Sequence, residues 1–279
     1  MYISIVFPNW NRASATMRYL ASVHRSNIAK NKLEIIMVDN NSTDNSINVV
    51  KKNYPSVKII KLNKNYGPSY ARNQGIKRAQ GEIIFCTDND LILEPNTLNI
   101  LSKELHKNSN TGIVGAKVVS IEDKQTIVTC GYEFNRWLAV ENGLKNCHFR
   151  KEADWIAGCC MMFRKTLIDE IGLFDEAFTF FGEDADFGLR ARKAGYGVVS
   201  LPNAIVYHPT AKKKQLNPSR YANYYASKFR LIRKHTSSVQ QLVSIGMHLT
   251  VLSLIRYLIG KPEYWRLKWQ ALKKVIKNN

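Results

Sequence analysis

The chain has 279 residues, of which 41 are lysine or arginine and 22 are aspartate or glutamate, so its formal net charge is +19. This length allows one large or two modest domains with a well-buried core. A hydrophobic content of 45% excludes a disordered or collagen-like chain. The five cysteines are odd in number and form no CxxC pair, so we expect no disulfide scaffold, no cysteine-rich zinc site and a reducing compartment. The N-terminal residues carry no signal-peptide pattern.

The positive charge is concentrated towards the C-terminus. Residues 201–279 hold 15 basic residues and one acidic residue, whereas residues 1–200 hold 26 and 21. Such a basic region suggests nucleic acid or an anionic lipid surface as a partner, and a solvated surface without a partner is the simpler alternative. Apolar runs with Trp, Lys and Arg at their edges favour helices that lie on a membrane. The apolar run at residues 242–259 is barely long enough to span a bilayer, so a single span or an ordinary buried helix is the alternative there.

The first 90 residues alternate strand-like apolar runs with helix-like stretches. We expect strands at residues 3–7, 33–38, 57–62 and 82–86, and helices at residues 15–26, 44–53 and 69–79. Buried strands separated by helices of this length are typical of βαβ units and a parallel sheet. Ligands of such sheets bind beyond the carboxyl ends of the strands, so the residues directly after each strand are candidates for a site.

The rest of the chain has a less regular pattern. We expect strands at residues 112–120, 154–163, 198–201 and 204–207, and helices at residues 165–171 and 183–194. Acidic side chains open the last of these helices, where they suit the positive end of the helix dipole. Near Pro218 the sequence changes to a region that is rich in basic residues and is expected to be helical.

Two aspartates follow the fourth expected strand, in the sequence TDND at residues 87–90. Carboxylates at positions i and i+2 of an extended segment can share a divalent cation that neutralises nucleotide phosphates. The chain has neither a GxGxxG fingerprint nor a Walker A loop, so phosphate must be bound in another way. Asp39, after the second strand, either accepts from a base or ribose or caps a turn. Arg72 either reaches a phosphate or base edge or lies on the surface.

Six sequence blocks between residues 3 and 209 stand in a recognisable order. They are SIVFPNWNR, VDNNSTDNS, NYGPSYARNQGIKRAQGEIIFCTDND, WIAGCCMMFRK, IGLFDEAFTFFGEDADFGLRARKAGY and VVSLPNAIVYHP. In these blocks the chain resembles family 2 glycosyltransferases, which implies an α/β fold of the GT-A type with a Rossmann-like, mostly parallel central sheet flanked by helices. The C-terminal part is similar to the basic membrane-associating helices of enzymes that build bacterial surface polysaccharides.

The resemblance implies two regions. Residues 1–215 form the GT-A catalytic domain, with a nucleotide-sugar half at about residues 1–90 and an acceptor half at about residues 91–215. Residues 216–279 form a C-terminal helical region that associates with a membrane.

The resemblance also implies roles for single residues. Those expected to bind the nucleotide sugar are Pro8, Trp10, Asn11, Arg12, Asp39, Asn41, Asn65, Arg72, Asp88 and Asn89. The metal, Mn²⁺ or Mg²⁺, is expected at Asp88, Asp90 and His208, although a lone histidine before a proline is often structural. The catalytic residues are expected to be Asp184, as general base, and Glu183, which equally suits orienting the acceptor; an acidic helix start is the simpler alternative. Trp155 either stacks on a sugar or packs in the core.

These parts suit an inverting transfer, which is a direct displacement at the anomeric carbon. A carboxylate must take the proton of the attacking hydroxyl, which typically accelerates a reaction by ~10²–10⁴-fold, and the cation stabilises the departing nucleoside diphosphate. We therefore expect a metal-dependent inverting glycosyltransferase that moves a sugar from a UDP- or dTDP-sugar to a hydroxyl of a lipid-linked or cell-surface glycan acceptor. We expect it in the cytoplasm, peripheral on the inner face of the plasma membrane, with no nucleic acid as partner.

Two other classes remain as alternatives. A nucleotidyltransferase also uses a Rossmann-like sheet and a carboxylate-bound metal, but the segment FPNWNR lacks the glycine pattern that a triphosphate needs. A basic nucleic-acid-binding protein accounts for the charge. It leaves unexplained the two acidic motifs, TDND at residues 87–90 and GED at residues 182–184.

Overall fold

A computed structural model of the protein describes residues 1–179, 181–210, 218–250, 254 and 263–277. Its N-terminal strands are β1 (Ile3–Asn9), β2 (Leu33–Asp39), β3 (Lys58–Lys61) and β4 (Ile83–Thr87). The helices between them are α1 (Ala13–His24), α2 (Ser46–Asn53) and α3 (Pro68–Arg78), and a short turn of 3-10 helix, η1 (Lys30–Lys32), precedes β2. β1 pairs in parallel with both β2 and β4, and β3 pairs in parallel with β2. The predicted βαβ pattern of residues 1–90 is thus confirmed.

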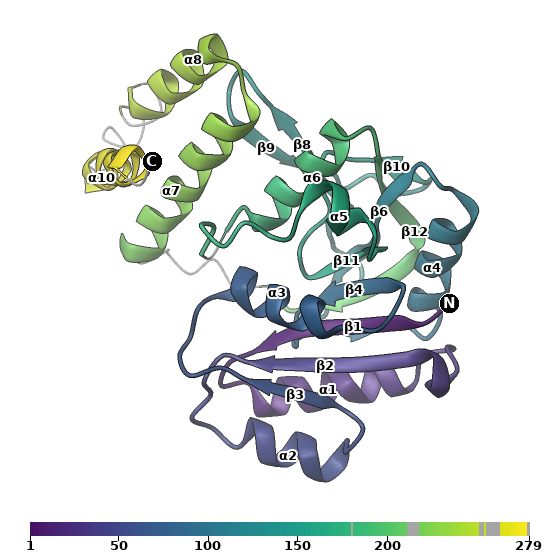
Figure 1. Ribbon diagram of the computed structural model, residues 1–279. Coiled ribbons are helices and arrows are strands. Elements are labelled where there is room, and N and C mark those ends of the chain that lie inside the picture. Colours follow the sequence, from purple (N-terminus) through teal and green to yellow (C-terminus); the bar gives the residue numbers. More distant parts are fainter. Residues whose placement is uncertain (180, 211–217, 251–253, 255–262, 278–279) are drawn as a thin grey trace.

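The winding of the sheet reverses at β1. The chain passes from β1 to β2 and β3 in one direction, and then returns to place β4 on the other side of β1. Because βαβ crossovers are right-handed, this reversal moves the helices to opposite faces, and Figure 1 shows α1 and α2 on one face and α3 on the other. The carboxyl ends of β1 and β4 therefore diverge at a switch point, where open α/β sheets bind their ligands.

The second half extends the same sheet with strands of both directions. The strands are β5 (Ile92–Leu93), β6 (Thr111–Ser120), β7 (Ile127–Thr129), β10 (Lys151–Glu152), β11 (Cys160–Arg164) and β12 (Gly197–His208). The helices are α4 (Thr97–Lys107), α5 (Leu167–Ile171) and α6 (Glu183–Lys193). Among the described residues, the sheet runs in the order β10-β12-β6-β11-β4-β1-β2-β3, with β5 on β12 and β7 on β6. β11 is antiparallel to both neighbours, whereas β12 and β6 are parallel.

Three features of this half differ from the expectation. The predicted strand at residues 154–163 begins only at Cys160, because the preceding residues turn into the site described below. The two short strands predicted at residues 198–201 and 204–207 are one strand, β12, whose pairing with β6 shifts register after Leu201. Neither α4 nor the two-stranded hairpin formed by β8 (Tyr132–Asn135) and β9 (Val140–Gly143) is predicted from the sequence.

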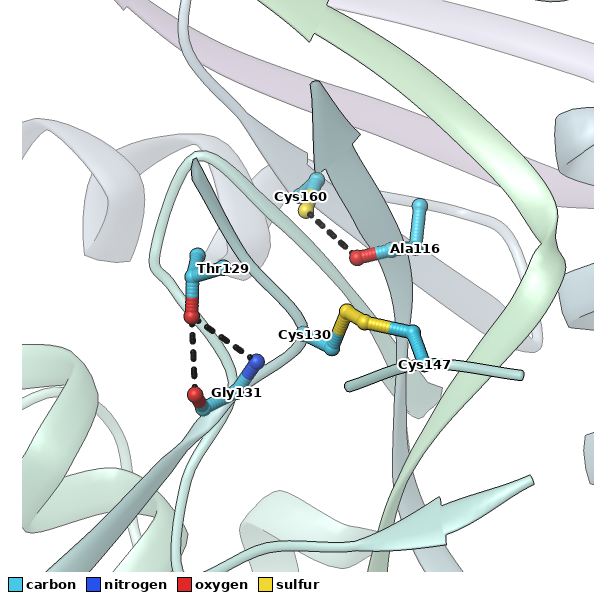
Figure 2. Close-up of a disulfide and its surroundings, with 6 residues drawn as sticks. All are labelled: Ala116, Thr129, Cys130, Gly131, Cys147 and Cys160. Atoms are coloured by element: carbon cyan, nitrogen blue, oxygen red, sulfur yellow. Dashed lines mark hydrogen bonds between the residues drawn. A yellow bond between two sulfur atoms is a disulfide. The ribbon is translucent and has the colours of Figure 1, made fainter. Parts of the chain in front are cut away.

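A disulfide closes the base of the β8–β9 hairpin. Cys130 and Cys147 are bonded, with their Cα atoms 6.2 Å apart (Figure 2). The backbone N–H of Cys130 donates to the carbonyl of Leu144, which brings the two ends of the hairpin together. The cysteine pattern predicts no disulfide scaffold, and this single bridge was not foreseen from the sequence. An odd number of cysteines does not exclude a disulfide, because Cys86, Cys159 and Cys160 are free while the other two are bonded.

Three helices follow the sheet and gather beside α6 and the β8–β9 hairpin (Figure 1). They are α7 (Pro218–His235), α8 (Ser238–Leu249) and α10 (Glu263–Lys277). Apolar side chains of α7 and α10 join those of α6 and the hairpin in a second buried cluster, which includes Phe134, Phe178, Leu189, Tyr225, Phe229, Ile232 and Val275. Part of the apolar surface that the sequence assigned to a membrane is thus used in packing within the protein.

The predicted membrane region has exposed apolar side chains as well. Leu242 is 78% exposed and Val239 is 62% exposed, both on α8. Within the described part of the chain, we find no helix with the length and apolar character that crossing a bilayer requires. Residues 251–253 and 255–259 of the predicted apolar run lie outside the described residues. Membrane association of residues 216–279 stays a prediction.

Candidate active site

Three side chains with metal-binding atoms meet at the carboxyl end of β4. Asp88 and Asp90 follow β4 directly, and His208 is the last residue of β12. Pairing of β5 with β12 brings the loop after β4 to the end of β12. One ligand atom of each of Asp88, Asp90 and His208 lies within 4.8 Å of the others. The structure therefore brings together the three residues predicted to hold a metal.

One oxygen of the Asp90 carboxylate has no hydrogen-bond partner among the described residues. Its Oδ1 is buried, lies 3.5 Å from His208 Nε2 and accepts no hydrogen bond from the described residues. Its Oδ2 lies 3.0 Å from Nη1 of Arg12, which remains 57% exposed. Burial and the nearby charge of Asp88 raise the pKa of Asp90, while His208 and Arg12 oppose this. A cation between the two carboxylates would offset both the burial of Asp90 and its repulsion by Asp88.

Arg72 joins this loop to the second acidic motif. Its guanidinium is 3% exposed and donates through Nη2 to Asp88 and through Nη1 to Glu183, both at 2.7 Å. The sequence predicts that Arg72 contacts the nucleotide. In this structure both terminal nitrogens are taken by carboxylates, so Arg72 fixes the start of α6 relative to the metal loop.

Glu183 and Asp184 form the first turn of α6. The turn before them needs a glycine, because Gly182 has a φ of +87°, which is rare for residues with a side chain. Asp184 accepts hydrogen bonds from the backbone N–H of Gly158 and of Ala185, both at 2.9 Å. Burial raises the pKa of both acids, and their mutual repulsion adds to that of Glu183, whereas Arg72 lowers it. A carboxylate with a raised pKa is suited to general-base work.

A buried polar network lies at the carboxyl ends of β1 and β2, with Asn9 at its centre. Asn9 donates to Asp39 Oδ1 at 2.9 Å and accepts from Thr16 at 2.8 Å and from Asn89 at 2.7 Å. Asp39 is fully buried, and its other oxygen accepts from the backbone N–H of Ser42. Asn89 faces this network rather than the metal ligands. No role is predicted for Asn9 from the sequence, although it lies two residues after the first expected strand at residues 3–7.

The loops above this network hold the other residues predicted to bind the nucleotide. Asn11 has a positive φ of 52°, and its side-chain oxygen accepts from the backbone N–H of Thr43 and Asp44. Asn65 accepts from Gly67 N–H and so shapes the turn before α3. Trp10, in contrast, is 55% exposed. The remaining two are Pro8, in β1 opposite Val38, and Asn41, with a φ of 63°.

The sequence of the chain matches known protein families over most of this site. Residues 4–172 match the profile of glycosyl transferase family 2, which is more than half of the chain. The chain belongs to glycosyl transferase family 2. Residues 138–214 of this glycosyltransferase also match the profile described as the N-terminal domain of galactosyltransferase. The predicted family and enzyme class are thereby confirmed, and the nucleotidyltransferase and nucleic-acid-binding alternatives are set aside.

Relatives of this glycosyltransferase occur in bacteria. An uncharacterized glycosyltransferase of Bacillus subtilis, YwdF, is 33% identical over 218 residues, which are 75% of this chain and 74% of the relative. An N-acetylglucosaminyl-diphospho-decaprenol L-rhamnosyltransferase of Mycobacterium tuberculosis is 22% identical over 277 residues, covering 86% of this chain and 89% of the relative. A poly(ribitol-phosphate) beta-N-acetylglucosaminyltransferase of Staphylococcus aureus, TarP, is 27% identical over 188 residues, which are 66% of this chain and 55% of the relative.

Solved structures share the fold of this glycosyltransferase. S. aureus TarS 1-349 in complex with UDP-GlcNAc has a TM-score of 0.69 at 18% identity, covering 99% of this chain and 81% of that one. A mannosyltransferase of Pyrobaculum calidifontis, in complex with GDP-Man and Mn²⁺, has a TM-score of 0.63 at 18% identity, covering 99% and 75%. At identities this low, the likeness concerns the fold alone, and it confirms the predicted GT-A architecture.

A cavity of about 160 Å³ lies beside Asp184 of the glycosyltransferase. Its lining includes Tyr132, Glu141, Trp155, Phe181, Tyr224 and Lys228. Trp155 is 3% exposed and stacks on the ring of Tyr132, with 5.3 Å between the ring centroids. Trp155 thus packs against Tyr132 and also lines the cavity, so its contact with a sugar stays a prediction. Gly188 of α6 permits this packing, because a Cβ there would lie 2.4 Å from the Cβ of Trp155.

Proposed function

We propose that this enzyme transfers a sugar, with inversion, from a UDP- or dTDP-sugar to a hydroxyl of a lipid-linked or glycan acceptor. The observation that carries the proposal is the convergence of Asp88, Asp90 and His208 at the switch point, with Arg72 linking them to the start of α6. The relatives support it, because their names describe transfer to a lipid diphosphate-linked sugar and to poly(ribitol-phosphate). Structures of similar fold contain UDP-GlcNAc and GDP-Man, which supports a nucleotide-sugar donor.

The donor set of the acidic loop fits a divalent metal. The buried Oδ1 of Asp90 has no hydrogen-bond donor among the described residues, and two carboxylates with one imidazole are ligands that Mn²⁺ accepts. Asp88, Asp90 and His208 would hold the ion. When bound, it would neutralise charge on the departing nucleoside diphosphate.

Asp184 serves as the general base and Glu183 as a positioning residue. Asp184 lines the cavity, where an acceptor hydroxyl can approach it, and two backbone N–H groups fix its carboxylate. Glu183 is instead held by Arg72. The proton of the attacking hydroxyl therefore moves to Asp184, while Glu183 keeps the helix start in register with the metal loop.

The nucleotide lies over the carboxyl ends of β1 and β2. Asp39, held by Asn9 and Ser42, orients this surface for the base, and the exposed Trp10 and Arg12 cover the nucleotide from the neighbouring loop. Pro8, Asn11, Asn41 and Asn65 shape the loops around it. Asn89 supports this surface indirectly, because it donates a hydrogen bond to Asn9.

Two substitutions test the reaction. Asp90→Ala should abolish transfer and remove the Mn²⁺-dependent part of UDP binding, measured as the rise in melting temperature on adding UDP and Mn²⁺. Asp184→Asn should keep that rise and lower turnover by ~10²-fold or more. Full activity of Asp90→Ala, or equal losses of UDP binding and turnover in Asp184→Asn, would contradict the assignments. A product that keeps the anomeric configuration of the donor would exclude the single displacement.

We also propose a place on the inner face of the plasma membrane. Exposed Leu242 and Val239, together with the basic excess of residues 201–279, support adsorption to an anionic surface. The protein should sediment with anionic vesicles and less with neutral ones, and salt should weaken the binding because it screens the charges. Equal sedimentation with both kinds of vesicle would contradict this mechanism.

A further inference from the structure

The cavity beside Asp184 has one wall made by the C-terminal region. Tyr224, Ser227 and Lys228 of α7 line it together with Asp184 at the start of α6. Glu141 of β9 lines it from a third element. The helix that the sequence assigned to a membrane thus contributes polar groups next to the candidate base.

Lys228 is the unusual group in this wall. It is 8% exposed, yet its ammonium donates no hydrogen bond to any part of the chain that the structure describes. The nearest carboxylate oxygen, Oε1 of Glu141, is 3.9 Å away. The ring of Tyr224 lies under the ammonium, 5.1 Å from Nζ to the ring centroid, and offsets part of the cost of burial. Three donors in a buried position remain available to a ligand.

Glu141 complements Lys228. Its side chain is 30% exposed and likewise accepts no hydrogen bond within the described residues. Burial raises the pKa of Glu141, and the charge of Lys228 opposes this. An open donor and an open acceptor 3.9 Å apart suit neighbouring hydroxyls, because each hydroxyl can accept from an ammonium and donate to a carboxylate.

The surroundings favour a sugar over an anion. Two carboxylates, those of Glu141 and Asp184, line the same space and would repel a phosphate. Aromatic rings from Tyr132, Phe181 and Tyr224 supply an apolar surface for the face of a sugar ring. The cavity, at about 160 Å³, holds about five waters at roughly 30 Å³ each, which is room for one ring.

We propose that Glu141 and Lys228 form an acceptor-binding pair that holds two neighbouring hydroxyls of one sugar ring and so presents another hydroxyl to Asp184. The inference rests on the proposed function, and it makes α7 part of the acceptor site. The helix is fixed there by Asp186 of α6, whose Oδ1 lies 2.8 Å from both Lys234 Nζ and His235 Nε2. The expected substrate class is a glycan or lipid-linked sugar with adjacent free hydroxyls.

The test measures sugar binding without turnover. N-acetylglucosamine is the probe, and saturation-transfer NMR detects its binding to the full-length protein in the presence of UDP and Mn²⁺. Lys228→Met, which removes the charge at similar length, should weaken probe binding by about 10-fold to 100-fold, as expected for a lost hydrogen bond from a charged group. Glu141→Gln should weaken it in the same direction. Lys273→Met, an exposed lysine of α10, is the matched control and should bind as the wild type does.

The outcomes separate this inference from the proposed reaction. Lys228→Met should keep the melting temperature of the wild type, because the buried cation that it removes makes no hydrogen bonds within the described residues. The variant should also keep the rise in melting temperature with UDP, because the proposed nucleotide-binding residues are unchanged. Equal probe binding by Lys228→Met and the wild type, or no binding by the wild type, overturns the inference. Probe binding that depends on Lys228, in a protein that transfers no sugar from any UDP- or dTDP-sugar, would instead reject the proposed reaction alone.

Discussion

Replacing Arg72 tests whether the two acidic motifs are held together by one buried cation. Arg72→Met removes the guanidinium at similar length and leaves Glu183 and Asp88 without the hydrogen bonds that they share at 2.7 Å. Breaking a buried ion pair by removing one partner costs ~3–5 kcal/mol of unfolding free energy. Asp88 is 34% exposed, so water replaces part of its lost interaction. We therefore expect a loss near ~3 kcal/mol, at the lower end.

The loss is measurable by thermal unfolding. At about 2–4 °C per kcal/mol for a protein of this size, the melting temperature of Arg72→Met should fall by roughly 6–12 °C. Mn²⁺ should raise the melting temperature of the variant more than that of the wild type, because an ion at Asp88 replaces one of the two lost interactions.

Arg78→Met is the matched control, since it alters an exposed arginine of the same helix. It should melt within about 1 °C of the wild type, as surface substitutions usually do. If Arg72→Met also melted that close to the wild type, then Arg72 would not connect the motifs. A large loss without any added response to Mn²⁺ would refute the link to the metal loop and leave only a structural role in α3.

Two further predictions concern packing around the site. Burial would raise the pKa of Asp186, but His235, Arg190 and Lys234 hold it at about 2, below the ordinary value of 3.8. The stability that this shift provides is complete above about pH 4 and is lost as the pH falls through about 2. Asp186→Asn should therefore lower the unfolding free energy by ~2 kcal/mol at pH 7, measured by urea unfolding. Between about pH 4 and about pH 2 the variant should lose less stability than the wild type does. Cys130→Ser should cost ~3 kcal/mol without reductant, because the disulfide closes a segment with a sequence separation of 17. The denatured wild type should then titrate three thiols, from Cys86, Cys159 and Cys160, and five titrated thiols would show that the disulfide is absent.

The amino-acid sequence by itself determined the N-terminal half of the fold. Continuous apolar runs become β1, β2 and β4, because strands covered on both faces must be apolar throughout. The two acidic motifs were also visible, since each stands where a strand or a helix meets a turn. These are local signals, and a pattern in neighbouring residues is enough to encode them.

The tertiary structure alone decided which residues share a site. Arg72 and Glu183 are 111 positions apart, and only the winding of the sheet around β1 puts α3 next to α6. The same holds for α7. Its basic and aromatic residues predict a membrane surface, but packing against α6 places Lys228 in the lining of the cavity that Asp184 also lines. Periodicity tells which face of an element is apolar, and it carries no information on which partner covers that face. That choice depends on burial summed over the whole chain, so the cavity wall formed by α7 and the contacts of Arg72 with Asp88 and Glu183 emerge only in the folded protein.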